Sequence, residues 1–218
     1  MQCLDAPDTK ECDVFMQDCP DGRKCMPISF DGAEAYNGTA CRPIDVDAVG
    51  LGEPCTMEDD PYSGFDNCPD ASFCFFVDDA LEGVCIDFCR GSVEDATCVD
   101  ACNRCLVSAD AITIPCLPTC DPRTQNCPAP LACQGGFGGI LCRRPDGDLG
   151  PGESCFESIE CMPGLECEAA CDGLPCCTPV CSLPDGPECD ALPGTTCTDA
   201  KRPHPEACND LSDLGFCL

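Results

Sequence analysis

Short apolar runs along this chain are separated by cysteines and turn-forming residues. The runs at 73–77 and 112–114 contain Phe, Val and Ile, which favour β-strands. Alternation places Phe73 and Phe75 on one face of a strand, so we expect them in the core, with an exposed partner-binding patch as the alternative. Helical spacing of apolar residues is nearly absent, and we expect no more than a turn or two of helix, in 94–103 and 206–214.

Turn signals are frequent throughout the chain. It contains 20 Gly and 22 Pro, and Pro-Asp-Gly and Pro-Gly sequences occur between cysteines. These residues favour tight turns. The pattern therefore predicts a small disulfide-rich fold class, with tandem β-hairpin modules, little helix and no continuous large core.

Composition favours the same fold class. Leu, Ile, Val and Phe make up about 19% of the chain and the formal net charge is -29, a combination that ordinarily gives disorder. Cysteine, however, accounts for 29 of 218 residues, above the ~8–10% that marks a disulfide scaffold. Cross-links remove entropy from the unfolded chain, so they substitute for the missing core.

The cysteine spacing favours disulfides over a thiolate metal site. A metal-thiolate protein needs paired ligands at short spacing. This sequence has no C-x-C, one C-C (Cys176, Cys177) and one C-x-x-C (Cys102, Cys105). Because disulfides persist only under oxidising conditions, we expect a secreted, periplasmic or cell-surface protein.

The order of the cysteines repeats. From Cys12 to Cys98 the steps are 7, 6, 16, 14, 13, 6, 11, 4 and 9 residues; from Cys120 to Cys189, omitting Cys171 and Cys176, they are 7, 6, 9, 13, 6, 6, 10, 4 and 8. We therefore expect a tandem duplication. Its structural disulfides are expected to involve Cys12, Cys19, Cys25, Cys41, Cys55, Cys68, Cys74, Cys85, Cys89, Cys98, Cys120, Cys127, Cys133, Cys142, Cys155, Cys161, Cys167, Cys177, Cys181 and Cys189.

Matching sequence defines the boundaries of the two copies. The motif C-D-x3-Q-[DN]-C-P-x4-C opens each copy, at 12–25 and 120–133. This predicts an N-terminal lead at 1–11, a first unit at 12–118 and a second unit at 119–218. A related cysteine theme recurs inside each unit. We therefore expect two half-modules per unit, at 12–50 and 51–118, then at 119–150 and 151–218.

An odd number of cysteines leaves at least one without an intramolecular partner. We expect Cys171 and Cys176 to pair locally within an insertion, and Cys3 to be the odd thiol because it precedes the first repeat. No basic and apolar leader opens the chain, which indicates a mature form with an initiator Met. A cysteine so near the start also suits a lipid-anchored precursor.

Catalytic signals are weak. The single histidine, His204, lies in Arg-Pro-His-Pro, which favours a solvent-facing loop, and no nucleophile-elbow, zinc-protease or phosphate-loop motif occurs. The glycine-rich run at 135–139 is typical of a flexible hairpin tip. We therefore do not expect an enzyme. A protease inhibitor that presents the Phe137 loop at 134–141 is the alternative.

Paired carboxylates in two matching hinges form the sharpest candidate site. These hinges are the segments 42–55 and 143–155, and both read D-x-D followed by G-x-G-E. Carboxylates two residues apart in a turn can present oxygens to one hard cation, so calcium is the one cofactor that we consider. The alternative is a solvated acidic linker. The candidate ligands are Asp45, Asp47, Glu53, Asp146, Asp148 and Glu153.

Charge and hydropathy restrict the partners. Eleven scattered Lys and Arg residues are too few for the basic clusters that bind nucleic acid. No apolar run approaches the ~20 residues of a membrane span. The expectation is a non-enzymatic binding or structural protein whose partner is another protein or a cell surface.

Several motifs resemble one family over nearly the whole chain. They are C-D-V-F-M-Q-D-C-P-D-G-R-K-C-M-P at 12–27, N-x-T-x-C-x-P at 37–43, G-E-P-C-T at 52–56, C-L-P-x-C-D-P-x-x-Q-N-C-P at 116–128 and C-C-T-P-V-C at 176–181. This pattern is similar to that of uncharacterised cysteine-rich extracytoplasmic proteins of myxobacteria. Members often carry the label ribulose phosphate epimerase, but that activity uses a βα-barrel with metal-binding His and Asp. This chain has one histidine and no βα repeat.

The second unit also resembles small disulfide modules of the dickkopf and colipase type, which supports the fold class alone.

Overall fold

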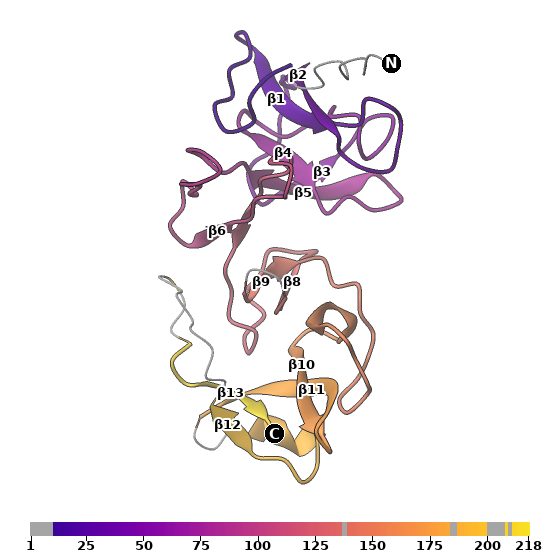
Figure 1. The fold of residues 1–218 in the computed structure, drawn as a ribbon, viewed down its shortest axis with the longest axis vertical. Helices are drawn as coiled ribbons and strands as arrows, with labels where there is room; N and C mark the ends of the chain where they lie inside the picture. The colour runs from indigo at the N-terminus through magenta and orange to yellow at the C-terminus, as the bar shows by residue number, and fades with distance from the viewer. Residues whose placement is uncertain (1–10, 137–138, 184–186, 200–207, 209–210) are drawn as a thin grey trace, which may run out of the picture. The chain divides into compact units, whose positions relative to one another are not determined.

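The structure is a computed structural model that describes residues 11–136, 139–183, 187–199, 208 and 211–218. The chain divides into two compact units, Met1–Leu117 (unit 1) and Pro118–Leu218 (unit 2). Figure 1 shows that each unit consists of short strands joined by long loops. The described residues contain no α-helix, so the predicted fold class of small disulfide-rich hairpins is confirmed.

The strands form small antiparallel sheets. Sheet orders are β1-β2, β3-β5-β4, β6-β7, β8-β9 and β10-β11-β13-β12. Two short 3-10 helices lie in the second half. The elements are β1 (Arg23–Ile28), β2 (Gly38–Pro43), β3 (Pro54–Thr56), β4 (Ser72–Phe75), β5 (Glu82–Asp87), β6 (Asn103–Cys105), β7 (Cys116–Pro118), β8 (Ala132–Gln134), β9 (Leu141–Arg143), η1 (Ser158–Glu160), β10 (Leu165–Cys171), β11 (Leu174–Ser182), η2 (Pro187–Ala191), β12 (Cys197–Asp199) and β13 (Leu214–Cys217).

One disulfide pattern recurs six times. A module contains four cysteines, of which the first bonds to the third and the second to the fourth; Cys102, Cys171, Cys176 and Cys208 lie outside the modules. The modules are 12–41 (module 1), 55–85 (module 2), 89–116 (module 3), 120–142 (module 4), 155–177 (module 5) and 181–217 (module 6). Each unit thus contains three modules, a finer repeat than the two half-modules expected from the sequence.

Cysteines that face each other across a hairpin do not bond to each other. In module 1, Cys25 and Cys41 are direct partners in the β1–β2 register, yet Cys25 bonds to Cys12 and Cys41 bonds to Cys19. The same relationship holds in modules 2, 4, 5 and 6. Each of these hairpins is therefore fastened to the segment that precedes it, and in modules 1 and 4 that segment is a loop without strand or helix.

The described cysteines outside the modules are also in disulfides. Cys171 bonds to Cys176, which confirms the predicted local pair. Cys102 and Cys208 are disulfide-bonded as well, so every cysteine in the described part of the chain is oxidised. Cys3, the expected odd thiol, lies outside the described residues.

The core of unit 1 lies where modules 1 to 3 meet. Met26, Ile28 and Ile114 are at most 4% exposed there. Phe73 is 1% exposed and stacks on Phe88, with ring centroids 4.5 Å apart and planes 4° from parallel. The predicted core position of Phe73 is confirmed, and Phe75 packs against the same cluster while partly exposed. Disulfides supply most of the remaining core in modules 2, 5 and 6.

One expectation about local structure, the strand at 112–114, was wrong. Residues 112–114 form no strand, although Ile112 and Ile114 are buried. The Ser108 hydroxyl accepts the Thr113 backbone N–H at 3.0 Å, so a local turn uses a donor that a strand would share with a neighbour. Segment 94–103 contains no helix, because its Cys98 is bonded across to Cys116. The described part of 206–214 is not helical either and ends at the start of β13.

Candidate functional site

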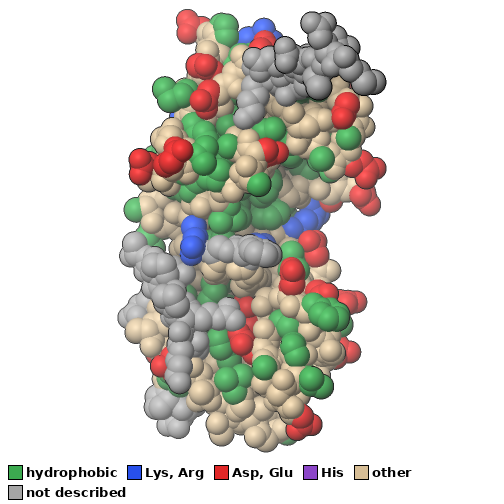
Figure 2. Space-filling model, viewed as in Figure 1, with side chains coloured by type: hydrophobic (Ala, Val, Ile, Leu, Met, Phe, Trp, Pro, Cys, Tyr) green, Lys and Arg blue, Asp and Glu red, His purple; other side chains and the backbone are tan. Residues whose placement is uncertain are grey.

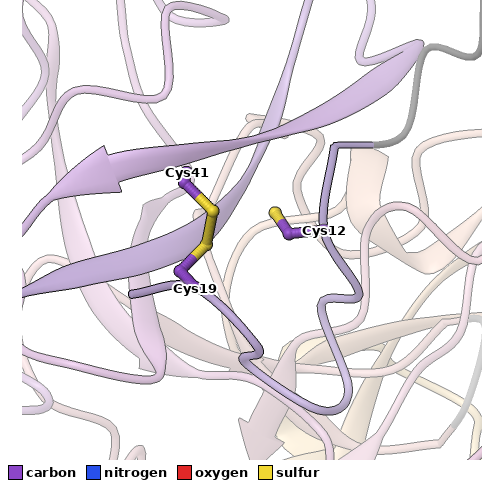
Figure 3. Close-up of side chains that lie close together, drawn as sticks. All are labelled: Cys12, Cys19 and Cys41. Carbon is purple, nitrogen blue, oxygen red and sulfur yellow. A yellow bond between two sulfur atoms is a disulfide. The ribbon is translucent and has the colours of Figure 1, made fainter. Parts of the chain in front are cut away.

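Clusters of sulfur atoms recur inside the modules. In each of modules 1 to 5, three cysteine Sγ atoms lie within 4.8 Å of one another. Figure 3 shows the cluster of module 1, in which Cys12 lies beside the Cys19–Cys41 bridge. A cysteine binds a metal as its thiolate. Because every cysteine of these clusters is in a disulfide, the clusters are packed bridges rather than metal-ligand sets.

The predicted hinge glutamates close tight turns. The Gly50 backbone N–H donates to the Glu53 carboxylate at 2.6 Å, and Gly150 donates to Glu153 at 2.5 Å. Gly52 has φ 77° and Gly152 has φ 81°, a left-handed conformation that glycine adopts at little cost. The G-x-G-E spacing that the two hinges share therefore has a structural explanation.

Each hinge turn is also joined to a strand of the following module. In unit 1, Gly52 N–H donates to the Cys85 carbonyl at 2.9 Å, and Cys85 N–H donates to the Glu53 carbonyl at 3.0 Å. In unit 2, Gly152 donates to Cys177 at 2.8 Å and Cys177 donates to Glu153 at 2.8 Å. The turn thus extends the edge of a disulfide-bonded hairpin.

The hinge aspartates differ between the two units. The Asp45 carboxylate accepts the Asp47 backbone N–H at 2.9 Å, which closes an Asx turn. Asp146 and Asp148 are exposed, and the neighbouring Leu149 pairs with Cys161 instead. The structure thus repeats the G-x-G-E turn but not the local arrangement of D-x-D. Calcium at the hinges stays a prediction.

The repeated motif C-D-x3-Q-[DN]-C has a structural role that the sequence did not reveal. The Gln17 side-chain amide donates to the carbonyls of Val14 and Cys25 at 2.9 and 3.1 Å, and its oxygen accepts the Cys25 N–H at 2.8 Å. Gln17 has φ 49°, which directs its side chain back toward the hairpin. The amide therefore replaces a missing strand partner for Cys25.

Unit 2 repeats this arrangement. Gln125 donates to Pro122 and Cys133 carbonyls at 2.8 and 3.0 Å and accepts the Cys133 N–H at 2.9 Å, with φ 51°. The [DN] position also has one role in both units, because Asp18 and Asn126 each accept a backbone N–H from the aspartate of the motif at 2.9 Å. The motif specifies a loop shape.

A buried ion pair joins modules 1 and 2. The Lys24 ammonium on β1 lies 2.5 Å from the Asp66 carboxylate, and both side chains are 0% exposed. Lys24 also donates to the carbonyls of Cys68 and Ser72 at 2.8 and 3.1 Å. Asp66 in turn accepts the backbone N–H groups of Cys68 and Cys74. Burial lowers the pKa of Lys24, and the Asp66 charge opposes that shift.

Unit 2 makes the corresponding connection with different side chains. Gln134 on β8 is 0% exposed and donates to the Cys161 carbonyl at 2.7 Å. Glu166, also 0% exposed, accepts the Gly135 backbone N–H at 2.6 Å. A Cβ at position 135 would lie 2.0 Å from the Glu166 carboxylate, so that glycine is needed for close approach. Burial lowers the pKa of the nearby Arg143, and Glu166 opposes this.

A hollow of about 400 Å³ opens on unit 1. Its walls come from the first loop of module 1 and from loops of module 3, including Val93 and Ala111. Val14 and Phe15 line it together with the acidic residues Glu11, Asp13 and Asp18. Apolar walls beside carboxylates suit a cationic group with an apolar stem, such as a lysine side chain.

Acidic residues predominate among the charged side chains of the surface in view. Figure 2 shows Asp and Glu side chains spread over the face in view, with few Lys and Arg among them. Phe137, which carries the inhibitor alternative, and His204 lie outside the described residues. Among the described residues, no helix is long and apolar enough to cross a membrane.

Comparisons with protein-family models, with curated proteins and with solved structures found no match to this chain. Because disulfides persist only under oxidising conditions, the disulfides favour an extracellular or other oxidising compartment, as the sequence predicted.

Proposed function

We propose that this protein is a non-enzymatic binding protein of the extracytoplasmic space, whose disulfide modules hold acidic loops in fixed shapes for a basic protein or surface partner. The use of the buried polar groups supports this proposal. Lys24, Asp66, Gln134 and Glu166 all make bonds that join one module to the next. These buried polar groups thus serve the scaffold, which leaves the exposed loops as the surface for a partner.

Charge supports a basic partner. A formal charge of -29 on 218 residues repels acidic molecules and attracts basic ones over a range that salt shortens. The hollow of unit 1 offers carboxylates next to apolar side chains, which is the surface that a Lys or Arg side chain fits. Membership of the myxobacterial group belongs to the same proposal, because that group is extracytoplasmic and cysteine-rich.

A capture experiment with two forms of the protein tests the proposal. The native full chain and a reduced, alkylated control of equal charge are immobilised and exposed to culture fluid and cell-surface extract of the source organism. We expect one basic partner to bind the native form stoichiometrically, to dissociate at high salt and to be recovered with unchanged mass. Equal binding to both forms, or recovery of a chemically altered partner, would contradict a shape-specific, non-enzymatic role.

A further inference from the structure

The Cys171–Cys176 bridge lies outside the six modules and closes a loop within a single hairpin. It joins residues five apart at the tip of the β10–β11 hairpin, whereas the module disulfides join residues at least 12 apart. A cross-link that closes a short loop constrains the unfolded chain least. This bridge therefore contributes less to the stability of the fold than any module disulfide.

The hairpin tip does not need the bridge for its shape. Asp172 and Gly173 occupy the turn with φ 52° and 80°, the positive values of a type I′ hairpin turn, for which Asp-Gly is a favoured pair. A Cβ at Gly173 would meet no atom within 4 Å, and the next residue, Leu174, is 68% exposed. The turn thus projects into open space, and Cys171 is partly exposed beside it.

The bridged tip lies against the hinge turn of unit 2. Cys171 Sγ lies 3.8 Å from the Gly152 carbonyl oxygen. Ser154 pairs with Cys176, and the Cys155 N–H donates to the Pro175 carbonyl at 3.4 Å. The hinge segment 152–155 is therefore in contact with both ends of the bridged loop.

Unit 1 has the same hinge without such a bridge. Its G-x-G-E turn makes the matching hydrogen bonds to Cys85, and Pro54 pairs with Val84 at the place of the Ser154–Cys176 pair. The hairpin tip at 76–81 contains no cysteine. Unit 1 is thus an internal reference that has the hinge but lacks the extra bridge.

We propose that Cys171–Cys176 is a redox-sensitive bridge that sets how firmly the β10–β11 tip holds the unit 2 hinge. A dithiol reductant supplies the two electrons. Its thiolate attacks the partly exposed Cys171 sulfur, the Cys171–Cys176 bond breaks, and Cys176 leaves as a thiolate that takes up a proton. The second thiol of the reductant then attacks the mixed disulfide, which releases Cys171 as a thiol and the reductant as a disulfide. The module disulfides remain intact.

Limiting dithiothreitol under native conditions tests this proposal on the full chain. Thiols are alkylated and identified by peptide mass spectrometry, and hydrogen exchange is measured on the same samples. We expect Cys171 and Cys176 to be labelled before any module cysteine, and exchange at 150–156 to rise several-fold while 50–56 stays unchanged. Earlier labelling of a module pair would overturn the proposal, as would a labelled tip with unchanged exchange at 150–156.

A double variant separates this role from a purely structural one. In Cys171→Ser/Cys176→Ser, we expect melting within a few degrees of the wild type and exchange at 150–156 equal to that of the reduced wild type without any reductant. A large loss of melting temperature would show that the bridge is needed for the fold and would contradict the proposal. Neither result depends on the binding partner proposed above.

Discussion

Lys24 on β1 and Asp66 in the loop of module 2 form an ion pair from which water is wholly excluded, because both side chains are 0% exposed. The pair is tolerated because each charge has further partners. Lys24 donates to three backbone carbonyls of module 2, and Asp66 accepts two backbone N–H groups. The contact fixes the position of one disulfide hairpin relative to the next where the apolar core is small.

Removal of the ammonium should strongly destabilise unit 1. In Lys24→Met the Asp66 carboxylate keeps its backbone donors but loses its buried counter-charge, which typically costs about 3–5 kcal/mol. Guanidinium unfolding with the disulfides intact measures this loss. The matched control is Arg23→Met: Arg23 is exposed and donates to the Cys41 carbonyl at 2.8 Å, so we expect a cost of about 1 kcal/mol or less. Equal costs for the two variants would contradict the role assigned to Lys24.

Substitution of Gln17 and Gln125 tests the hydrogen bonds that their side-chain amides make to Cys25 and Cys133. Gln17→Glu keeps the size of the side chain but replaces two amide donations with a carboxylate that faces the Val14 and Cys25 carbonyls. We expect a loss of about 2–3 kcal/mol, and the same for Gln125→Glu in unit 2. Thr56→Glu adds the same charge at an exposed strand position and should have little effect. Thermal melting of the three variants makes the comparison.

The Asp121–Arg123 pair should make unit 2 sensitive to acid. Burial alone would raise the pKa of Asp121, but its hydrogen bonds from Arg123, at 2.9 and 2.8 Å, hold that pKa below its ordinary value. A carboxyl whose folded pKa is depressed stabilises the fold above its unfolded pKa of about 3.9. That stability is lost as pH falls from about 4 through the folded pKa.

The variant Asp121→Asn should therefore show a smaller loss of melting temperature between pH 5 and pH 2 than the wild type. Asp13→Asn is the matched control in unit 1, because Asp13 occupies the same motif position but the residue two places later is Phe15. Its carboxylate accepts the Phe15 backbone N–H rather than a guanidinium. If both variants lost the same melting temperature between pH 5 and pH 2, Arg123 would contribute nothing to the acid sensitivity of unit 2.

Calcium at the hinges predicts that melting occurs at a higher temperature in calcium chloride than in EDTA, because a ligand that binds only the folded state stabilises it. The increase should disappear when Asp45, Asp47, Asp146 and Asp148 are changed to Asn together, which leaves the turn bonds of Glu53 and Glu153 in place. An unchanged wild-type midpoint would reject calcium. The two hinges would then be acidic turns alone.

The sequence predicted the features that follow from spacing. Repeated steps between cysteines predicted two units, and the chain divides into two compact units. The local pair Cys171–Cys176 followed from its position outside the pattern. Alternation around Cys74 placed Phe73 in the core. Each of these inferences depends on distance along the chain, which the sequence contains directly.

Features that depend on distance in space could not be predicted in the same way. The connection between modules uses Lys24, which precedes Cys25, in unit 1, but Gln134, which follows Cys133, in unit 2. The two residues are not at equivalent positions, so alignment of the repeats does not reveal their shared role. The third module of each unit was also missed, because its last step is 11 residues in unit 1 and 20 in unit 2.

Disulfide mapping tests the central claim, the sixfold pairing of first with third and second with fourth cysteines. The native chain is alkylated without reduction, digested, and analysed by mass spectrometry with electron-transfer fragmentation. We expect peptides that join Cys12 to Cys25 and Cys19 to Cys41, and the equivalent pairs in the other five modules. Bonds between the directly opposed cysteines, such as Cys25 with Cys41, or alkylated thiols within the modules, would contradict the account.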